Sequence, residues 1–216
     1  MKKTSIKLPE ARWMLGLLII LYLIGIVGFS VPILKPIFTA LTPFNLMLSF
    51  LLLILYFKEK SNQFWIISVL IVLLGYLVEV AGVKTGKIFG HYSYGETLGL
   101  KWFDTPLLIG INWLMLSLAA YVIVKNIGLK TWPGALFGAF LMLAYDIVLE
   151  PVAIKTDMWE WVQFNVPIRN YVAWYVISFG FLMLLYRTNI QTENKLAKGL
   201  FLLQFLFFLI LSVIMY

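Results

Sequence analysis

Apolar runs about as long as a membrane is thick recur along the whole chain. A bilayer-spanning helix needs about 20 mostly apolar residues, because the hydrocarbon core is roughly 30 Å thick and each helical residue rises about 1.5 Å. The runs that meet this length are Trp13–Val31, Ala40–Phe57, Phe64–Val83, Pro106–Val124, Trp132–Ile154, Ile168–Tyr186 and Leu196–Met215. We therefore predict an all-α fold, a polytopic transmembrane helix bundle of about seven spans.

The composition supports this prediction for the chain as a whole. Hydrophobic residues make up 62% of the 216 residues and charged residues 12%, and the mean hydropathy is +0.94. Ordinary soluble domains are about 45–50% apolar and roughly 25% charged. No polar segment is long enough to form its own core, so residues 1–216 are predicted to form a single integral membrane domain. The first run lacks a small-residue cleavage pattern and is therefore treated as a span, not a signal peptide.

The basic residues predict topology and not nucleic-acid binding. The net charge is +7, but Lys and Arg are scattered between the apolar runs and form no stripe. Most of them lie in the N-terminal segment and in the second, fourth and sixth connections. Because basic connections stay cytoplasmic, the N-terminus is predicted inside and the C-terminus outside, in a multi-pass protein of the cell (inner) membrane.

Several kinds of cofactor chemistry are not supported by the residues present. The chain has no Cys and a single His, His91, so thiolate sites and centres that need several imidazoles are not expected. It contains neither a phosphate-cradling Gly-x-x-x-x-Gly-Lys loop nor a dinucleotide glycine fingerprint. An enzyme with this sequence is predicted to work without a metal and without a redox cofactor.

Carboxylates inside the predicted spans are the first candidates for function. Glu79 lies in the third span, where an ionised side chain is costly, so we expect it to face the bundle interior and to rest protonated. Asp146 and Glu150 are four residues apart in the fifth span and should share one helical face, as an acid beside a base. Pro151 should kink or end that helix. The alternatives are a structural role for Glu79 and a solvated helix end for the pair.

Two connections on the predicted non-cytoplasmic side are rich in Gly, Tyr and Trp. Residues 85–95 combine turn-forming glycines with Tyr92 and Tyr94, which favours a re-entrant or capping loop over a cavity; an interfacial aromatic belt is the alternative. In the other connection, Trp159 and Trp161 flank Glu160, and interface anchoring explains them equally well. Asn170 and Trp174, four apart, should point the same way.

At these residues the chain resembles a membrane carotenoid-biosynthesis family, the hydratases of the γ-carotene 1′-hydratase and bisanhydrobacterioruberin hydratase type. The stretches that carry the resemblance lie between about residues 70 and 180. They are Glu79, 85–86, 89–94, 98–99, 106–107, Trp113, 146–153, 159–161 and 166–174. Their combination is far more specific than any one of them.

The resemblance implies addition of water across the terminal C1=C2 bond of a carotenoid ψ-end group, without a cofactor. Such a reaction needs a proton donor, shelter for a tertiary carbocation and a base for the attacking water. We assign acid and base work to Asp146 and Glu150, with Glu79 as a third carboxylate. The predicted substrate-contacting and cation-stabilising residues are Tyr92, Tyr94, Trp113, Trp159, Trp161, Asn170 and Trp174. The expected partners are a lipophilic carotenoid that enters from the bilayer, membrane lipid and other carotenoid enzymes in a complex, with no nucleic acid.

Three other functions fit parts of the pattern. A cofactor-free carotenoid cyclase or isomerase could use the same protonated alkene. A small proton-coupled transporter also needs embedded carboxylates, although the sequence shows no inverted repeat. A non-catalytic carotenoid-binding or assembly protein explains the aromatic residues, but a hydrocarbon ligand gives it no need for acids.

Overall fold

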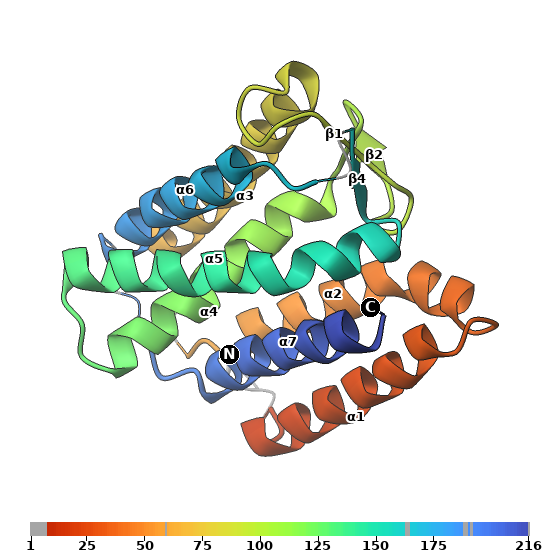
Figure 1. Cartoon of the computed structure of the whole chain (residues 1–216). Coiled ribbons are helices and arrows are strands. Elements are labelled where there is room, and N and C mark those ends of the chain that lie inside the picture. The colour runs from red at the N-terminus through yellow and green to blue at the C-terminus, as the bar shows by residue number, and fades with distance from the viewer. Residues whose placement is uncertain (1–7, 59, 163–164, 188–189, 191, 216) are drawn as a thin grey trace.

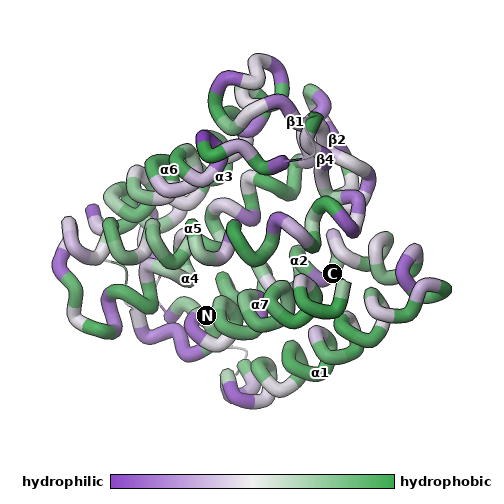
Figure 2. The backbone as a smooth tube through the Cα atoms, viewed as in Figure 1, coloured by the Kyte–Doolittle hydropathy of each residue, from purple (hydrophilic) through white to green (hydrophobic). Residues whose placement is uncertain are grey.

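The computed structural model describes residues 8–58, 60–162, 165–187, 190 and 192–215. Within these residues, seven helices are long and apolar enough to cross a membrane. They are α1 (Ala11–Ser30), α2 (Lys35–Leu55), α3 (Asn62–Thr85), α4 (Leu108–Asn126), α5 (Thr131–Lys155), α6 (Ile168–Tyr186) and α7 (Lys195–Ile214) (Figure 1). Hydrophobic residues dominate the helices, and hydrophilic ones gather at their ends (Figure 2). The predicted all-α transmembrane bundle is confirmed.

Helix α4 forms the centre of the bundle. Most of its residues are buried, and it packs against α2, α3, α5, α6 and α7. Small side chains such as Ser117, Ala119 and Ala120, each at most 1% exposed, let the neighbouring helices approach it closely. Helix α1 lies at the edge of the molecule and packs on α2 and α7 (Figure 1). Lipid-facing positions are therefore concentrated on the outer helices.

The two aromatic connections contain short strands, which the sequence did not predict. Among the described residues, β1 (Tyr92–Tyr94) pairs antiparallel with β4 (Trp159–Trp161), and β2 (Lys101–Trp102) pairs with β3 (Thr105–Pro106). We call the β1–β4 pair the cap ribbon. It joins the α3–α4 connection to the α5–α6 connection at one end of the bundle (Figure 1). The capping form of the predicted loop is thus the one observed.

Helix α2 begins earlier than predicted, whereas α5 runs through its proline to about the predicted end of the span, Ile154. Helix α2 begins at Lys35 and not at Ala40, because Pro36 sits in the first turn, where its missing N–H costs nothing. Helix α5 does not end at Glu150: it continues through Pro151 to Lys155. The last turn is closed by Thr156, whose backbone N–H and side-chain hydroxyl both donate to the carbonyl of Val152, at 2.9 and 2.7 Å.

The membrane orientation can be tested with single cysteines, because the natural chain has none. Lys130 and Glu160 are exposed and lie beyond opposite ends of α5, so they face opposite sides of the membrane. We expect Glu160→Cys to react with a membrane-impermeant maleimide in intact cells and Lys130→Cys to react only after permeabilisation. The reverse pattern would contradict the charge-based orientation, and labelling of both in intact cells would contradict the seven-span topology.

Candidate active site

Glu79 lies near the end of α3, is 3% exposed and accepts three hydrogen bonds. Its Oε2 accepts the hydroxyls of Tyr92 at 2.6 Å and Tyr94 at 2.8 Å, and its Oε1 accepts the Trp113 indole N–H at 2.9 Å. Gly75, one turn earlier on the same face, makes room for Trp113, because a Cβ there would lie 2.9 Å from the Trp113 Cβ. Close packing of α3 on α4 therefore brings the indole to the carboxylate.

The two tyrosines that bind Glu79 come from β1, outside the spans. Burial raises the pKa of each phenol well above its ordinary value, and the negative charge of Glu79 raises it further. Both phenols are therefore protonated at neutral pH. Each can donate to the carboxylate, as the short distances indicate.

Asp146 and Glu150 share one face of α5, as their spacing predicted. The Asn170 side-chain amide of α6 donates to both, at 2.9 Å to Asp146 Oδ2 and 3.2 Å to Glu150 Oε1. Glu150 Oε2 accepts the indole N–H groups of Trp159 and Trp161, each at 3.0 Å. Asp146 Oδ1 is buried and has no hydrogen-bond partner among the described residues. The Asn170 amide thus links Glu150, both of whose oxygens accept hydrogen bonds, to Asp146, of which only Oδ2 does.

The cap ribbon places four aromatic side chains over the carboxylates. Its register aligns Tyr92 with Trp161 and Tyr94 with Trp159. Successive strand residues point to opposite faces, so these four rings point inward, while Ser93 and Glu160 between them are exposed. The rings pack in pairs, with centroids 5.1 Å apart for Tyr92 and Trp161. Trp159 and Trp161 are therefore buried hydrogen-bond donors and not interfacial anchors.

A small chamber of about 20 Å³ lies between the two glutamates. It is lined by two carboxylates, one amide, two phenols and apolar or aromatic side chains. These residues are Glu79, Phe89, Tyr92, Tyr94, Ile109, Glu150, Trp159, Trp161, Asn170 and Trp174. A site needs at least about 10–15 Å³ and two to four polar partners to hold a water molecule. The chamber fits about one water and is far too small for an organic end group.

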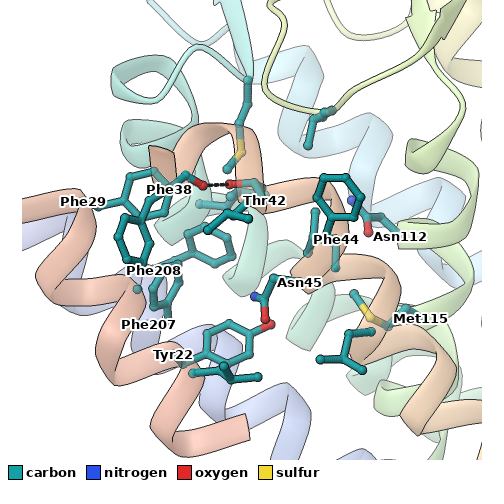
Figure 3. Close-up of a pocket in the computed structure, with 18 of the residues that line it drawn as sticks. Tyr22, Phe29, Phe38, Thr42, Phe44, Asn45, Asn112, Met115, Phe207 and Phe208 are labelled. Atoms are coloured by element: carbon teal, nitrogen blue, oxygen red, sulfur yellow. Dashed lines mark hydrogen bonds between the residues drawn. The ribbon is translucent and has the colours of Figure 1, made fainter. Parts of the chain in front are cut away.

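A much larger cavity of about 360 Å³ adjoins the chamber and shares Ile109, Trp159 and Trp174 with it. Its walls come mainly from α1, α2, α4, α5 and α7, and Figure 3 shows phenylalanines from α1, α2 and α7 around it. The polar side chains at this cavity include Tyr22 and Asn45 (Figure 3). The sequence did not single out these residues, because apolar positions spread over five spans carry no recognisable spacing.

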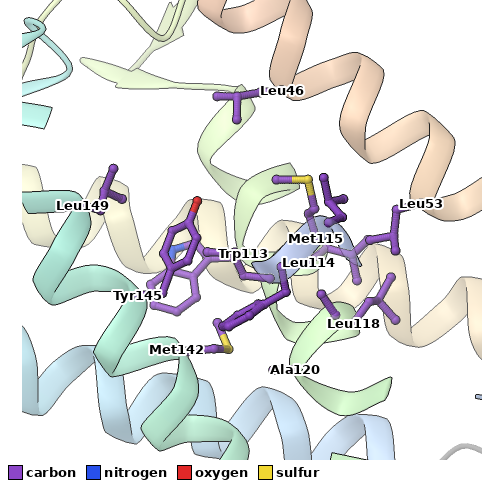
Figure 4. Packing of buried hydrophobic residues seen from close by; sticks show 14 of the residues in the cluster. Leu46, Leu53, Trp113, Leu114, Met115, Leu118, Ala120, Met142, Tyr145 and Leu149 are labelled. Atoms are coloured by element: carbon purple, nitrogen blue, oxygen red, sulfur yellow. The ribbon is translucent and has the colours of Figure 1, made fainter. Parts of the chain in front are cut away.

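Helix α5 presents two adjacent faces to the two spaces. Tyr145 and Leu149, one turn apart, line the large cavity, whereas Asp146 and Glu150, the next residues along, face Asn170. Figure 4 shows Tyr145 projecting from α5 toward α4, near Trp113. A ligand in the cavity thus lies against the same helix turns that carry the acids.

The structure brings together nearly all of the residues predicted from the sequence. Glu79, Glu150, Tyr92, Tyr94, Trp159, Trp161, Asn170 and Trp174 line the chamber. Trp113 stacks on Trp174, with ring centroids 4.2 Å apart, and acts through Glu79. Asp146 lies behind Asn170 and is not among the residues that line the chamber. His91 is exposed, and within the described residues no group of three His, Asp or Glu side chains is placed to hold a metal ion.

Comparison with known proteins identifies the family of the chain. The sequence model of the family described as "Carotenoid biosynthesis protein" matches residues 41–216. The chain belongs to this family. It is also 32% identical over 114 residues to the bisanhydrobacterioruberin hydratase of Haloarcula japonica, a match that covers 49% of this chain and 39% of that protein. No solved structure matches the chain. The chain is therefore a multi-pass membrane protein of carotenoid biosynthesis.

The indole donors of Glu150 can be tested by a stability measurement. Trp161→Phe keeps a ring beside Tyr92 but removes one of three N–H groups from a buried carboxylate, and we expect a loss of about 1–3 kcal/mol in the free energy of unfolding. Unfolding of purified protein in SDS, followed by circular dichroism, measures this loss. Trp132→Phe is the matched control, since Trp132 is 63% exposed, and it should change stability little. Equal effects of the two substitutions would contradict the hydrogen-bonding role.

Proposed function

We propose that this protein adds water across the terminal C1=C2 bond of a carotenoid ψ-end group by acid and base catalysis, without a cofactor. One observation carries the proposal: a chamber with room for about one water, bounded by Glu79 and Glu150, opens beside a large apolar cavity. Hydration of an alkene in a membrane needs these two neighbouring spaces, one for water and one for hydrocarbon.

The Asp146 and Glu150 pair is suited to hold one proton between its two members. Two ionised carboxylates held by a single amide would repel each other strongly in an apolar interior. Glu150 accepts from two indole N–H groups and one amide NH₂ group. None of these groups can accept a hydrogen bond from a protonated carboxyl group. Asp146 Oδ1 has no partner among the described residues and is the better place for the proton. Glu150 is the member of the pair that reaches the chamber.

The reaction then proceeds in two balanced steps. In the reactive form the shared proton is on Glu150, which gives it to C2. The electrons of the double bond form the new C–H bond, which leaves a tertiary cation at C1 and a pair without its proton. Water in the chamber attacks C1, and the proton that it loses returns to the anionic pair. Trp159 and Trp174 lie between the two spaces, where their ring faces can stabilise the cation. Glu79, held in place by Tyr92, Tyr94 and Trp113, positions the water.

The chamber favours hydration over the rival activities. Cyclisation or isomerisation of the same cation would end by loss of a proton and has no use for a water site between two carboxylates. A proton-coupled transporter would use embedded acids, but it would not account for membership in a carotenoid-biosynthesis family. The relative from Haloarcula japonica is named a hydratase, which supports the same choice over the aligned region.

The catalytic pair can be tested in a host that accumulates lycopene or γ-carotene. We expect Asp146→Asn and Glu150→Gln to lower hydration by about 100-fold or more, the ordinary contribution of a positioned acid or base. Mass analysis of the pigments measures the conversion, because hydration adds one water to the mass and cyclisation leaves the mass unchanged. For Asp146, which acts through Glu150, the loss should fall on kcat with little change in KM.

The matched control is Glu160→Gln, an acid on the exposed face of the cap ribbon. It should leave the conversion unchanged, and all variants should be present in the membrane at similar amounts. Membranes supplied with ¹⁸O-labelled water should yield a labelled alcohol. Normal conversion by Asp146→Asn would remove that residue from the mechanism, and an unlabelled product would overturn hydration itself.

A further inference from the structure

We propose that the large cavity receives one end of an acyclic isoprenoid chain directly from the lipid, through a lateral opening between α1 and α2. The identity of the ligand rests on the proposed function, whereas the route rests on the geometry of the cavity. The mouth, the lining and the wall that the cavity shares with the chamber each support the route.

The mouth of the cavity faces the membrane and not water. Ile24 of α1 and Leu41, Phe44 and Leu48 of α2 line the cavity, yet they are 50%, 48%, 72% and 37% exposed. In a spanning helix an exposed apolar side chain contacts lipid tails. A side chain that is both exposed to lipid and part of the cavity wall marks a point where the two spaces meet.

The lining favours a ligand that is hydrocarbon along most of its length. Most of the cavity wall is aliphatic or aromatic (Figure 3). The Tyr22 hydroxyl is already engaged, since it lies 3.2 Å from Ser49 Oγ and accepts from Gln204 Nε2 at 2.8 Å. Asn112 Oδ1 is buried at the cavity without a partner among the described residues and could meet one donor of a ligand. Against the rest of the wall, a polar substituent would lose its hydration without gaining a hydrogen bond.

The cavity holds only part of a long polyene. Its volume of about 360 Å³ lies at the lower end of the roughly 300–1,000 Å³ typical of small-ligand pockets. We infer that the terminal isoprene units enter while the rest of the chain remains among the lipids. Past Ile109, Trp159 and Trp174 the inserted end meets the chamber, so the alkene next to the chain end is the one that reaches Glu150.

Gly25 keeps one wall of this route open. It lies on α1 at the cavity, and a Cβ at this position would lie 3.1 Å from the ring of Phe207 on α7. Phe207 also lines the cavity, so a larger side chain at position 25 either enters the cavity or pushes the Phe207 ring out of its place in the wall. Gly16, on the same helix, has nothing within 4 Å of an added Cβ and offers a matched control.

The test compares Gly25→Leu with Gly16→Leu in a lycopene-producing host. We expect Gly25→Leu to retain about tenfold less lycopene per protein after mild detergent purification, since filling a hydrophobic pocket rejects a ligand by this order. The absorbance of the polyene relative to protein measures the retention, and Gly16→Leu should match the natural protein. Equal retention by the two variants would overturn the route.

A second pair keeps the test decisive if Gly25→Leu fails to fold. Leu41→Trp places bulk at the mouth, and Ile37→Trp places the same bulk on the lipid face of α2 at a residue that does not line the cavity. Only Leu41→Trp should lower retention. If lycopene is retained by the natural protein, lost in the cavity variants and never hydrated, the route stands and the proposed function fails. If hydration is normal in both cavity variants, the route fails and the proposed function stands.

Discussion

Carboxyl groups buried in a membrane must be met by hydrogen-bond partners, and this requirement shapes the centre of the molecule. Within a spanning helix the backbone N–H groups are already used by the helix itself. Donors for Glu79 and Glu150 therefore have to come from side chains of other segments. The structure supplies indoles, phenols and an amide from α4, α6 and the cap ribbon, three donors to each glutamate. The cap ribbon thus supplies hydrogen-bond donors, from outside the spans, to two carboxyl groups inside them.

The arrangement separates a polar space from an apolar one by a thin aromatic wall. Trp159 serves both sides: its ring borders the large cavity and its N–H holds Glu150. Trp174 borders both spaces and stacks on Trp113, which holds Glu79. The side chains that would stabilise a carbocation are therefore fixed by the same contacts that orient the carboxylates. A substitution in this wall should affect substrate position and acid geometry together.

Periodicity and the cost of intramembrane charge were enough to predict the spans and the candidate acids. The one-turn spacing of Asp146 and Glu150 placed them on one face, as the shared Asn170 amide shows. Pairing of the cap ribbon was not predictable, because three-residue strands in distant connections give no signal of their own. The alternation in Tyr92–Tyr94 and Trp159–Trp161 was visible in the sequence, but only the register shows that both aromatic faces point inward. The position of Asp146 behind Asn170 depends on how α5 packs against α6, which no local pattern specifies.

Helix α1 contributes to the wall of the large cavity but carries none of the three carboxylates. The match to the family begins at residue 41, so the part of the cavity wall built by Tyr22, Gly25 and Phe29 of α1 lies outside the matched region, while all three carboxylates lie inside it. Under the proposed function, substitutions in α1 would change the cavity wall and leave the three carboxylates in place. Substrate range and reaction could then vary separately, and an exchange of α1 between relatives would be a direct way to redirect such a protein to another pigment.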